Sequence, residues 1–134
     1  VHALGEIPRP HPDAAVGVVE DADGRRPDPV PDDQALAVET ADGVAVVLGC
    51  GHAGLRNTVE YAETVTGGTV RTVVGGTHLV ARDEEEVHEL VDWLDGRLDR
   101  FGAAHCTGST ARRILAERLP DAFQSVGVGT EFEL

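Results

Sequence analysis

The chain has 134 residues, which suits one domain, and 41% of them are hydrophobic, which excludes disorder. It carries 24 acidic against 11 basic residues, and the formal net charge of −13 excludes nucleic acid and anionic membrane surfaces as partners, because phosphate contact needs basic patches. All of the basic residues are arginine. This lysine-free, acidic composition favours a halophilic protein, whose self-repulsion is screened by a salt-rich cytoplasm, over an acidic mesophilic one.

The sequence predicts neither a membrane span nor a targeting segment. No apolar run reaches about 18 residues, and no basic-then-apolar leader precedes the first residues. We therefore expect a cytoplasmic protein, in which Cys50 and Cys106 are small buried residues or site thiols instead of a disulfide. The chain begins with valine and contains no methionine, which indicates either a noncanonical start or the later part of a longer protein.

Residues 1–34 are expected to form an irregular, proline-rich arm. They hold six of the seven prolines and the charge-rich stretch EDADGRRPDP, which leaves room for at most a short strand at Ala15–Val19. The compact α/β part is then expected to cover residues 35–134. It opens with the apolar runs ALAVET and VAVVL, and the intervening Ala41-Asp42-Gly43 predicts a hairpin with a bulged turn.

Strands and helices alternate in the remainder of the chain, which indicates the α/β class. A helix is predicted over residues 53–66, with an apolar face and a stop at Gly67-Gly68, followed by a strand over 70–74. Asp83 and Glu86 predict the capped start of a second helix, which we expect to run to Gly102. Its apolar stripe comprises Val87, Leu90, Val91, Leu94, Leu98 and Phe101. A short strand over 103–105, a helix over 110–119 and a final strand over 125–134 complete the prediction.

Three strand-like runs end in a tight, glycine-containing turn with a histidine. These are VAVVLGCGH at His52, VRTVVGGTH at His78 and FGAAHCTG at His105. In a parallel sheet the three turns gather at one edge, where open α/β sheets keep their ligand sites. Because neutral imidazole is a preferred metal ligand, this clustering predicts a metal site, although each histidine alone is explained equally well as an ordinary loop residue.

The GCGHAG turn at residues 49–54 also fits the dinucleotide fingerprint G-x-G-x-x-G, after a strand and at the start of a helix. Two observations argue against a nicotinamide or flavin site. The acidic residue expected at the end of the next strand is absent, since the first carboxylate after it is Asp83. His52 also stands where a bare backbone should approach the pyrophosphate. A Rossmann-like module is therefore the weaker alternative.

Five segments in order, GEIPR, DDQAL, GCGHAGLRNTVEYA, VVGGTHLV and HCTG, resemble the metallo-β-lactamase-fold hydrolases. They are most similar to the branch named for the archaeal dihydropterin-methyl-ribofuranosylaminobenzene 5′-phosphate synthase. The resemblance implies that His52 and His105 are metal ligands, with Cys50 a weaker candidate. It places His78 at the site edge, where it either binds metal or acts on the substrate as a catalytic residue. Candidate substrate-binding residues are Asn57, Thr107 and Ser109.

One motif of that superfamily is missing. The chain contains no H-x-H-x-D-H, and His2 and His11 have the wrong spacing. We therefore expect an α/β chain that forms the second half of a metallo-β-lactamase-like αββα sandwich and exposes an apolar sheet face. The resemblance implies a zinc- or manganese-dependent hydrolase of a phosphoester or related bond in a small, phosphorylated substrate, active once the other half is supplied. The chain is expected to pair with itself or with that half. The alternative is a non-catalytic remnant that binds a ligand or a partner.

Overall fold

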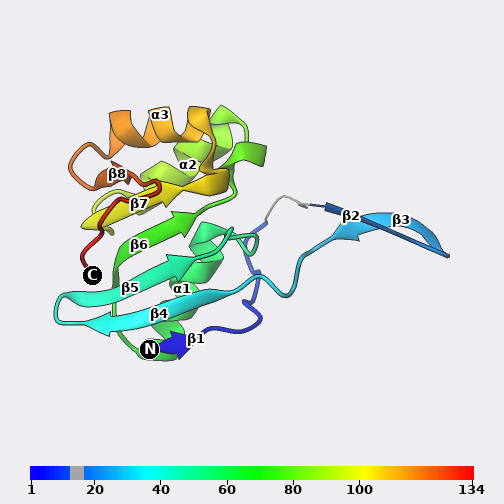
Figure 1. The fold of residues 1–134 in the computed structure, drawn as a ribbon, viewed down its shortest axis with the longest axis horizontal. Helices are drawn as coiled ribbons and strands as arrows, with labels where there is room; N and C mark the ends of the chain where they lie inside the picture. The colour runs from blue at the N-terminus through cyan, green and yellow to red at the C-terminus, as the bar shows by residue number, and fades with distance from the viewer. Residues whose placement is uncertain (13–16) are drawn as a thin grey trace.

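A six-stranded mixed sheet forms the centre of the structure, a computed structural model that describes residues 1–12 and 17–134 (Figure 1). The strands follow the spatial order β1 (His2–Ala3), β4 (Ala35–Thr40), β5 (Gly43–Leu48), β6 (Val70–Gly76), β7 (Arg100–Ala104) and β8 (Phe123–Ser125). The strands from β5 to β8 are parallel neighbours, whereas β4 pairs antiparallel with both β1 and β5. The predicted α/β class is confirmed.

Three helices connect the successive parallel strands: α1 (Leu55–Thr66), α2 (Glu84–Leu94) and α3 (Ser109–Arg118). Because such crossovers are right-handed and each strand lies beside the previous one, all three helices cover the same face of the sheet (Figure 1). The core lies between this face and the helices. Its largest fully buried apolar side chains are Val46, Val59, Val70, Val73, Val87, Val91, Leu94, Phe101, Ile114 and Leu115.

The helix ends follow the sequence signals. Asp83 caps α2 by accepting a hydrogen bond from the Glu86 backbone at 2.9 Å, and the Glu86 side chain accepts one from the Asp83 backbone at 3.1 Å. This reciprocal pair satisfies two amide groups at the start of the helix. Gly67 ends α1 in the left-handed conformation, with φ of 71°. No helix in the described ranges is long and apolar enough to span a membrane.

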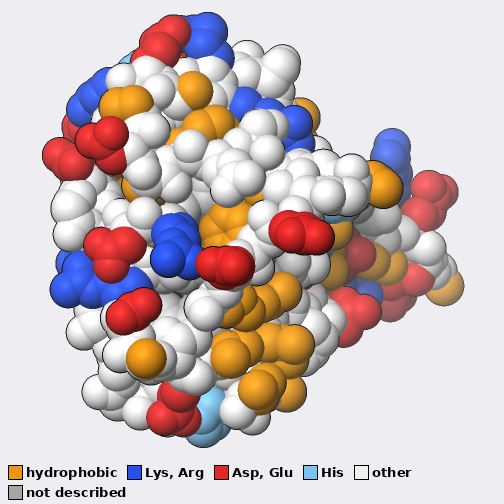
Figure 2. Space-filling view, turned by 60° about the vertical axis from the view of Figure 1, so that its left-hand side comes forward, with side chains coloured by type: hydrophobic (Ala, Val, Ile, Leu, Met, Phe, Trp, Pro, Cys, Tyr) orange, Lys and Arg blue, Asp and Glu red, His pale blue; other side chains and the backbone are white. Residues whose placement is uncertain are grey.

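The opposite face of the sheet carries apolar side chains that none of the helices in residues 1–12 and 17–134 covers. Leu36 on β4 is 42% exposed, and Val38, Val47 and Val74 on β4, β5 and β6 are half-buried. The strand register places these four residues on one face, away from the core residues that alternate with them. Figure 2 shows hydrophobic side chains gathered on one side of the molecule. Near β7 the chain end covers this face, because Phe132 and Val126 lie directly over Gly102.

The amino-terminal arm is more regular than the sequence predicts. β1 pairs with β4, and Leu4 and Ile7 are buried in the core. Further along, β2 (Gly17–Asp21) and β3 (Gly24–Asp28) form a separate two-stranded hairpin that projects away from the body (Figure 1). The predicted strand at Ala15–Val19 lies partly outside the described residues, and its described part belongs to β2. The prolines therefore allow strand structure at the edge of the fold, where an amide donor is not needed.

Other boundaries also differ from the predictions, including that of the strand expected over 103–105, which is β7 and begins at Arg100. The turn between β4 and β5 has two residues, because Gly43 already pairs with Thr40. The helix predicted to reach Gly102 ends at Leu94, because the left-handed Gly96 (φ of 70°) redirects the chain, and Phe101 is buried on β7 instead. The final strand stops at Ser125, because the chain turns back on itself with a hydrogen bond from the Thr130 backbone to the Gly127 carbonyl.

Candidate metal centre

The three histidine turns lie at one edge of the sheet. His52 follows β5, and His78 follows β6 as the N-cap of the short 3-10 turn η1 (Leu79–Ala81). His105 opens the 3-10 turn η2 (His105–Thr107) after β7. Since β5, β6 and β7 are adjacent and parallel, their carboxyl ends meet at the same edge. The expected arrangement of parallel strands is thus present, and it gathers the sequence-predicted residues into two groups.

Two glycines allow the turns to pack this closely. A Cβ atom on Gly75 would lie 2.2 Å from the carbonyl oxygen of Leu48, and one on Gly76 would lie 2.5 Å from that of Gly49. The Gly76 backbone donates a hydrogen bond to the same Gly49 oxygen at 3.1 Å. No side chain fits at either position, so the Gly75-Gly76 pair is what brings the end of β6 against the turn after β5.

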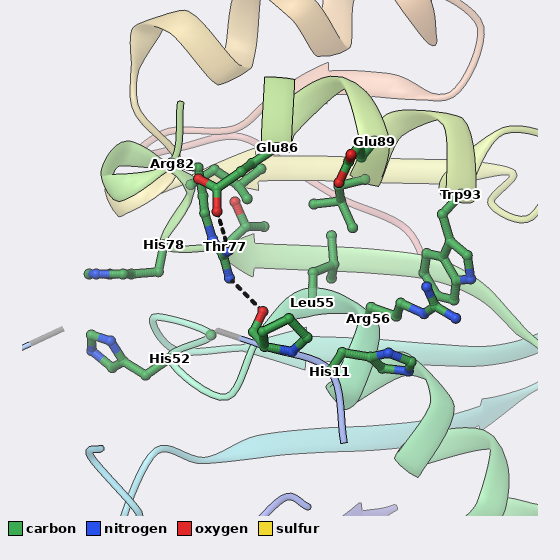
Figure 3. A pocket seen from close by; sticks show the side chains of 15 residues that line it. His11, His52, Leu55, Arg56, Thr77, His78, Arg82, Glu86, Glu89 and Trp93 are labelled. Carbon is green, nitrogen blue, oxygen red and sulfur yellow. Dashed lines mark hydrogen bonds and ion pairs between the residues drawn. The ribbon is translucent and has the colours of Figure 1, made fainter. Parts of the chain in front are cut away.

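His52 and His78 form the first group. Their ring centroids lie 4.4 Å apart, and Figure 3 shows the two rings side by side at one end of a pocket. The Nδ1 atom of each ring is buried and has no hydrogen-bond partner in the described part of the chain. Because buried ring nitrogens are normally satisfied, two unpartnered ones side by side fit a bound ion or substrate group. The donor set therefore suits a divalent metal, which is what the sequence resemblance implies.

The electrostatics keep His78 neutral. Burial lowers its pKa below the ordinary 6.5, the nearby His52 lowers it further, and Asp33 opposes both effects. A neutral imidazole can ligate a metal or accept a proton at neutral pH. Asp33 is itself buried, and its carboxylate accepts a hydrogen bond from the Ala53 backbone at 3.1 Å, which fixes the turn that carries His52. In the sequence Asp33 stands out only as part of the DDQAL segment, with no site role predicted for it.

Cys50, His105 and Cys106 form the second group. One ligand atom from each of the three lies within 4.8 Å of the other two. The Cys106 thiol donates a hydrogen bond to the Cys50 carbonyl oxygen at 3.3 Å, and both cysteines are free thiols. Burial raises the pKa of the Cys50 thiol above 9.0, and the neighbouring Cys106 raises it further. The structure thus brings the predicted ligands His105 and Cys50 together, and it adds Cys106.

The predicted substrate-binding residues have different surroundings. Asn57 is 2% exposed, and its amide bonds with the His11 backbone and the Ala53 carbonyl, so it ties the amino-terminal arm to the first histidine turn. Thr107 is fully buried, accepts a hydrogen bond from the Thr77 hydroxyl at 3.0 Å and donates one to the Ala104 carbonyl. Both residues hold the site loops in place. Ser109 is exposed at the start of α3, and direct contact with a substrate stays a prediction for it.

A pocket of about 240 Å³ adjoins the histidine pair on the helix side (Figure 3). It runs between α1 and α2, and Trp93 lies at the end away from His52 and His78. The guanidinium of Arg56 lies 5.2 Å from the centre of the Trp93 ring and pairs with Glu60 at 3.0 Å. Trp93 was not predicted as a site residue, although a lone tryptophan on an otherwise charged helix face is a signal that could have drawn attention to it.

The GCGHAG turn does not have the surroundings of a dinucleotide site. β5 lies between a parallel strand, β6, and an antiparallel one, β4, so the strand order contains no switch between two parallel halves at this turn. Dinucleotides bind at such a switch point. The turn instead directs the His52 ring to the ring of His78.

Comparison with solved structures identifies this architecture. A crystal structure of a metal-dependent hydrolase of the β-lactamase superfamily superposes with a TM-score of 0.85 and 27% sequence identity, and it covers 98% of this chain. The chain has the metallo-β-lactamase fold. The match takes in 52% of the solved protein, so the chain spans about half its length.

Curated relatives of this metallo-β-lactamase-fold chain come from Methanocaldococcus jannaschii. Its 7,8-dihydropterin-6-methyl-4-(beta-D-ribofuranosyl)-aminobenzene-5'-phosphate synthase is 30% identical over 96 residues, which are 70% of this chain and 33% of that protein. An uncharacterized protein of the same organism is 33% identical over 72 residues, 54% of this chain and 27% of its own length. No family model matches the chain. The resemblance to the synthase branch is thereby confirmed.

Proposed function

We propose that the chain forms the part of a metal-dependent hydrolase that carries the histidine turns, and that the enzyme acts on a phosphoester or related bond in a small molecule. The observation that supports this most is the pair of buried Nδ1 atoms on His52 and His78, which have no hydrogen-bond partner among the described residues. They stand at the sheet edge where the carboxyl ends of three parallel strands meet. Such an edge is where α/β folds bind ligands.

Under this proposal each side chain has a role. His52, His105 and Cys50 would hold a divalent ion of the zinc or manganese type. When bound, such an ion supplies Lewis acidity and a nucleophile from water near neutral pH. His78 would accept the proton of the attacking water, because its lowered pKa keeps its ring neutral. Ser109 would contact the charged group of the substrate, and the pocket that ends at Trp93 would take the rest of it.

We further propose that activity needs a second segment carrying H-x-H-x-D-H, packed on the open sheet face. The chain contains no such motif, and it spans about half of the solved relative. The four apolar residues Leu36, Val38, Val47 and Val74 offer a surface for the other sheet of a sandwich. Without that segment the same surface would favour self-association of the chain.

A reconstitution assay tests the proposal. The chain alone should hydrolyse a chromogenic phosphodiester no faster than buffer. Adding a segment with H-x-H-x-D-H, fused or in trans, should give activity that a chelator removes. His105→Ala and His78→Ala should then abolish the activity with unchanged circular dichroism, whereas His88→Ala, on α2, should leave it intact. Strong chelator-sensitive hydrolysis by the monomeric chain alone would contradict the need for a second segment.

The alternative is a binding remnant without catalysis. The pocket supports it, because a tryptophan and an arginine line a cavity of about 240 Å³, which is slightly below the usual range of about 300–1,000 Å³ and suits a compact ligand without any metal chemistry. Under this alternative the reconstituted protein would bind the phosphodiester and release no product.

A further inference from the structure

The group formed by Cys50, His105 and Cys106 goes beyond the ligands that the resemblance implies, because it includes a second thiol. The two cysteines come from turns after β5 and β7, which are separated in the sheet by β6. They meet across the end of β6 because Gly76 has no side chain there: a Cβ on Gly76 would lie 3.0 Å from the Cys106 sulfur and 3.1 Å from the Cys50 Cα. The backbone is thus shaped to place both thiols together.

We propose that Cys50, His105 and Cys106 bind one thiophilic divalent ion of the zinc class, with Cys106 as a direct ligand. Zinc bonds of about 2.3 Å to sulfur and about 2.0–2.1 Å to nitrogen require ligand atoms roughly 3.5–3.8 Å apart in a tetrahedron. The three atoms already lie within 4.8 Å of one another. Small side-chain rotations therefore suffice, together with loss of the hydrogen bond from the Cys106 thiol to the Cys50 carbonyl.

This assignment selects the metal. Thiolates favour zinc and cobalt, whereas manganese prefers carboxylate and water oxygens. Two thiols and an imidazole leave a fourth position open, which is the arrangement of a catalytic zinc site and not of a closed structural one. His105 is exposed, so solvent reaches this cluster. The inference rests on the proposed function in taking the same sheet edge as its metal site, and it narrows the zinc-or-manganese choice to zinc.

Cobalt titration of the reduced 134-residue chain tests the assignment. Binding of one Co²⁺ should give the thiolate-to-cobalt charge-transfer band in the near ultraviolet and the visible bands of tetrahedral cobalt. Zn²⁺ should displace it, and Mn²⁺ should not. Cys106→Ser and Cys50→Ser should each reduce the band and weaken binding by at least about 100-fold, more than a change outside the ligand shell does. His88→Ala is the matched control, because His88 lies on α2, where its ring contacts Arg118, and its loss should keep the band.

A second measurement does not depend on cobalt. Stoichiometric zinc should protect both cysteines from alkylation in the wild-type chain and leave Cys50 reactive in Cys106→Ser, with circular dichroism confirming that the variant is folded. Cobalt bound without a thiolate band, a band unchanged in Cys106→Ser, or a cysteine pair found as a disulfide under reductant would each overturn the assignment.

The outcomes separate this inference from the proposed function. If the reconstituted enzyme with Cys106→Ser keeps full metal-dependent hydrolysis and uses manganese, the inference is wrong and the proposed function stands. If the thiolate band appears as expected but the reconstituted protein hydrolyses nothing, the metal assignment stands and the proposed function is wrong.

Discussion

His78 and His105 share a backbone conformation that side chains other than glycine rarely adopt. Their φ angles are 49° and 48°, and the other described non-glycine residue in this region is Val30. Each such residue costs about 1–2 kcal/mol relative to the usual conformations. Strain of this kind persists only where the surrounding structure fixes it, and it gathers at functional sites. Two site histidines held in this way indicate that the orientation of the ring is maintained at a cost in stability.

Substitutions at His105 can therefore separate the cost of backbone strain from the loss of a metal ligand. His105→Gly should be more stable than His105→Ala by about 1–2 kcal/mol, because glycine adopts the left-handed conformation without strain. Urea unfolding of the two metal-free variants measures the difference. The same pair of substitutions at His88, inside α2, should give the opposite order, with glycine about 1 kcal/mol less stable than alanine. Equal stability of the two His105 variants would show that the backbone relaxes on substitution.

Glu60 links the amino-terminal arm to α1 in a pH-dependent way. Burial raises its pKa, but hydrogen bonds from His11 and Arg56 outweigh that effect and hold the pKa below the ordinary 4.5. Stability from this carboxylate is therefore complete above about pH 4.5 and is lost as the pH falls through the lower pKa of the folded state. Glu60→Gln and His11→Ala should each flatten the acid side of the stability curve, measured by urea unfolding between about pH 5 and pH 3. If either variant kept the wild-type slope of stability against pH on the acid side, this link between the arm and α1 would be ruled out.

At the scale of the elements, local signals predicted most of the fold. The capping box at Asp83, the glycine stop at Gly67 and the alternation of strands and helices are confirmed. The predicted end of α2 was wrong because Leu98 and Phe101 continue a helical spacing by chance: Leu98 is buried in the connection after the helix, and Phe101 is buried on β7. The contact between Cys106 and Cys50 and the pocket at Trp93 depend on contacts between distant segments, which no local pattern encodes.

The glycine pair at the end of β6 gives a test at this scale. Gly75→Ala should lower the free energy of unfolding by about 2–4 kcal/mol, because the added Cβ overlaps the Leu48 carbonyl and the φ of 132° is strained. Gly67→Ala is the matched control: its φ of 71° carries the conformational cost, but no atom lies within 4 Å of the added Cβ. Thermal or urea unfolding of both variants isolates the destabilisation that the steric overlap causes. Equal losses would mean that the two turns are not closely packed.

The whole molecule is dominated by its charge. With 24 acidic and 11 basic residues, repulsion between carboxylates outweighs the ion pairs that the arginines form. Salt screens both the repulsion and the ion pairs, and because the repulsion is stronger, screening stabilises the fold on balance. The melting temperature should therefore rise as potassium chloride is increased from dilute to molar concentration, as followed by circular dichroism. A flat or falling curve would indicate an ordinary mesophilic origin and would leave the metal site unaffected.

The β2–β3 hairpin interrupts the sequence between two segments of the same sheet and core. Residues before it, including β1 and the buried Leu4 and Ile7, belong to the same body as β4, which follows it. The hairpin itself is mostly exposed. The body is therefore built from two segments, one before and one after the hairpin. Strand pairing and core packing hold these segments together, and the hairpin lies between them in the sequence. A protein tag inserted at the tip, between Asp21 and Gly24, would lie away from the histidine turns. This tip is therefore a suitable attachment point for immobilising the chain.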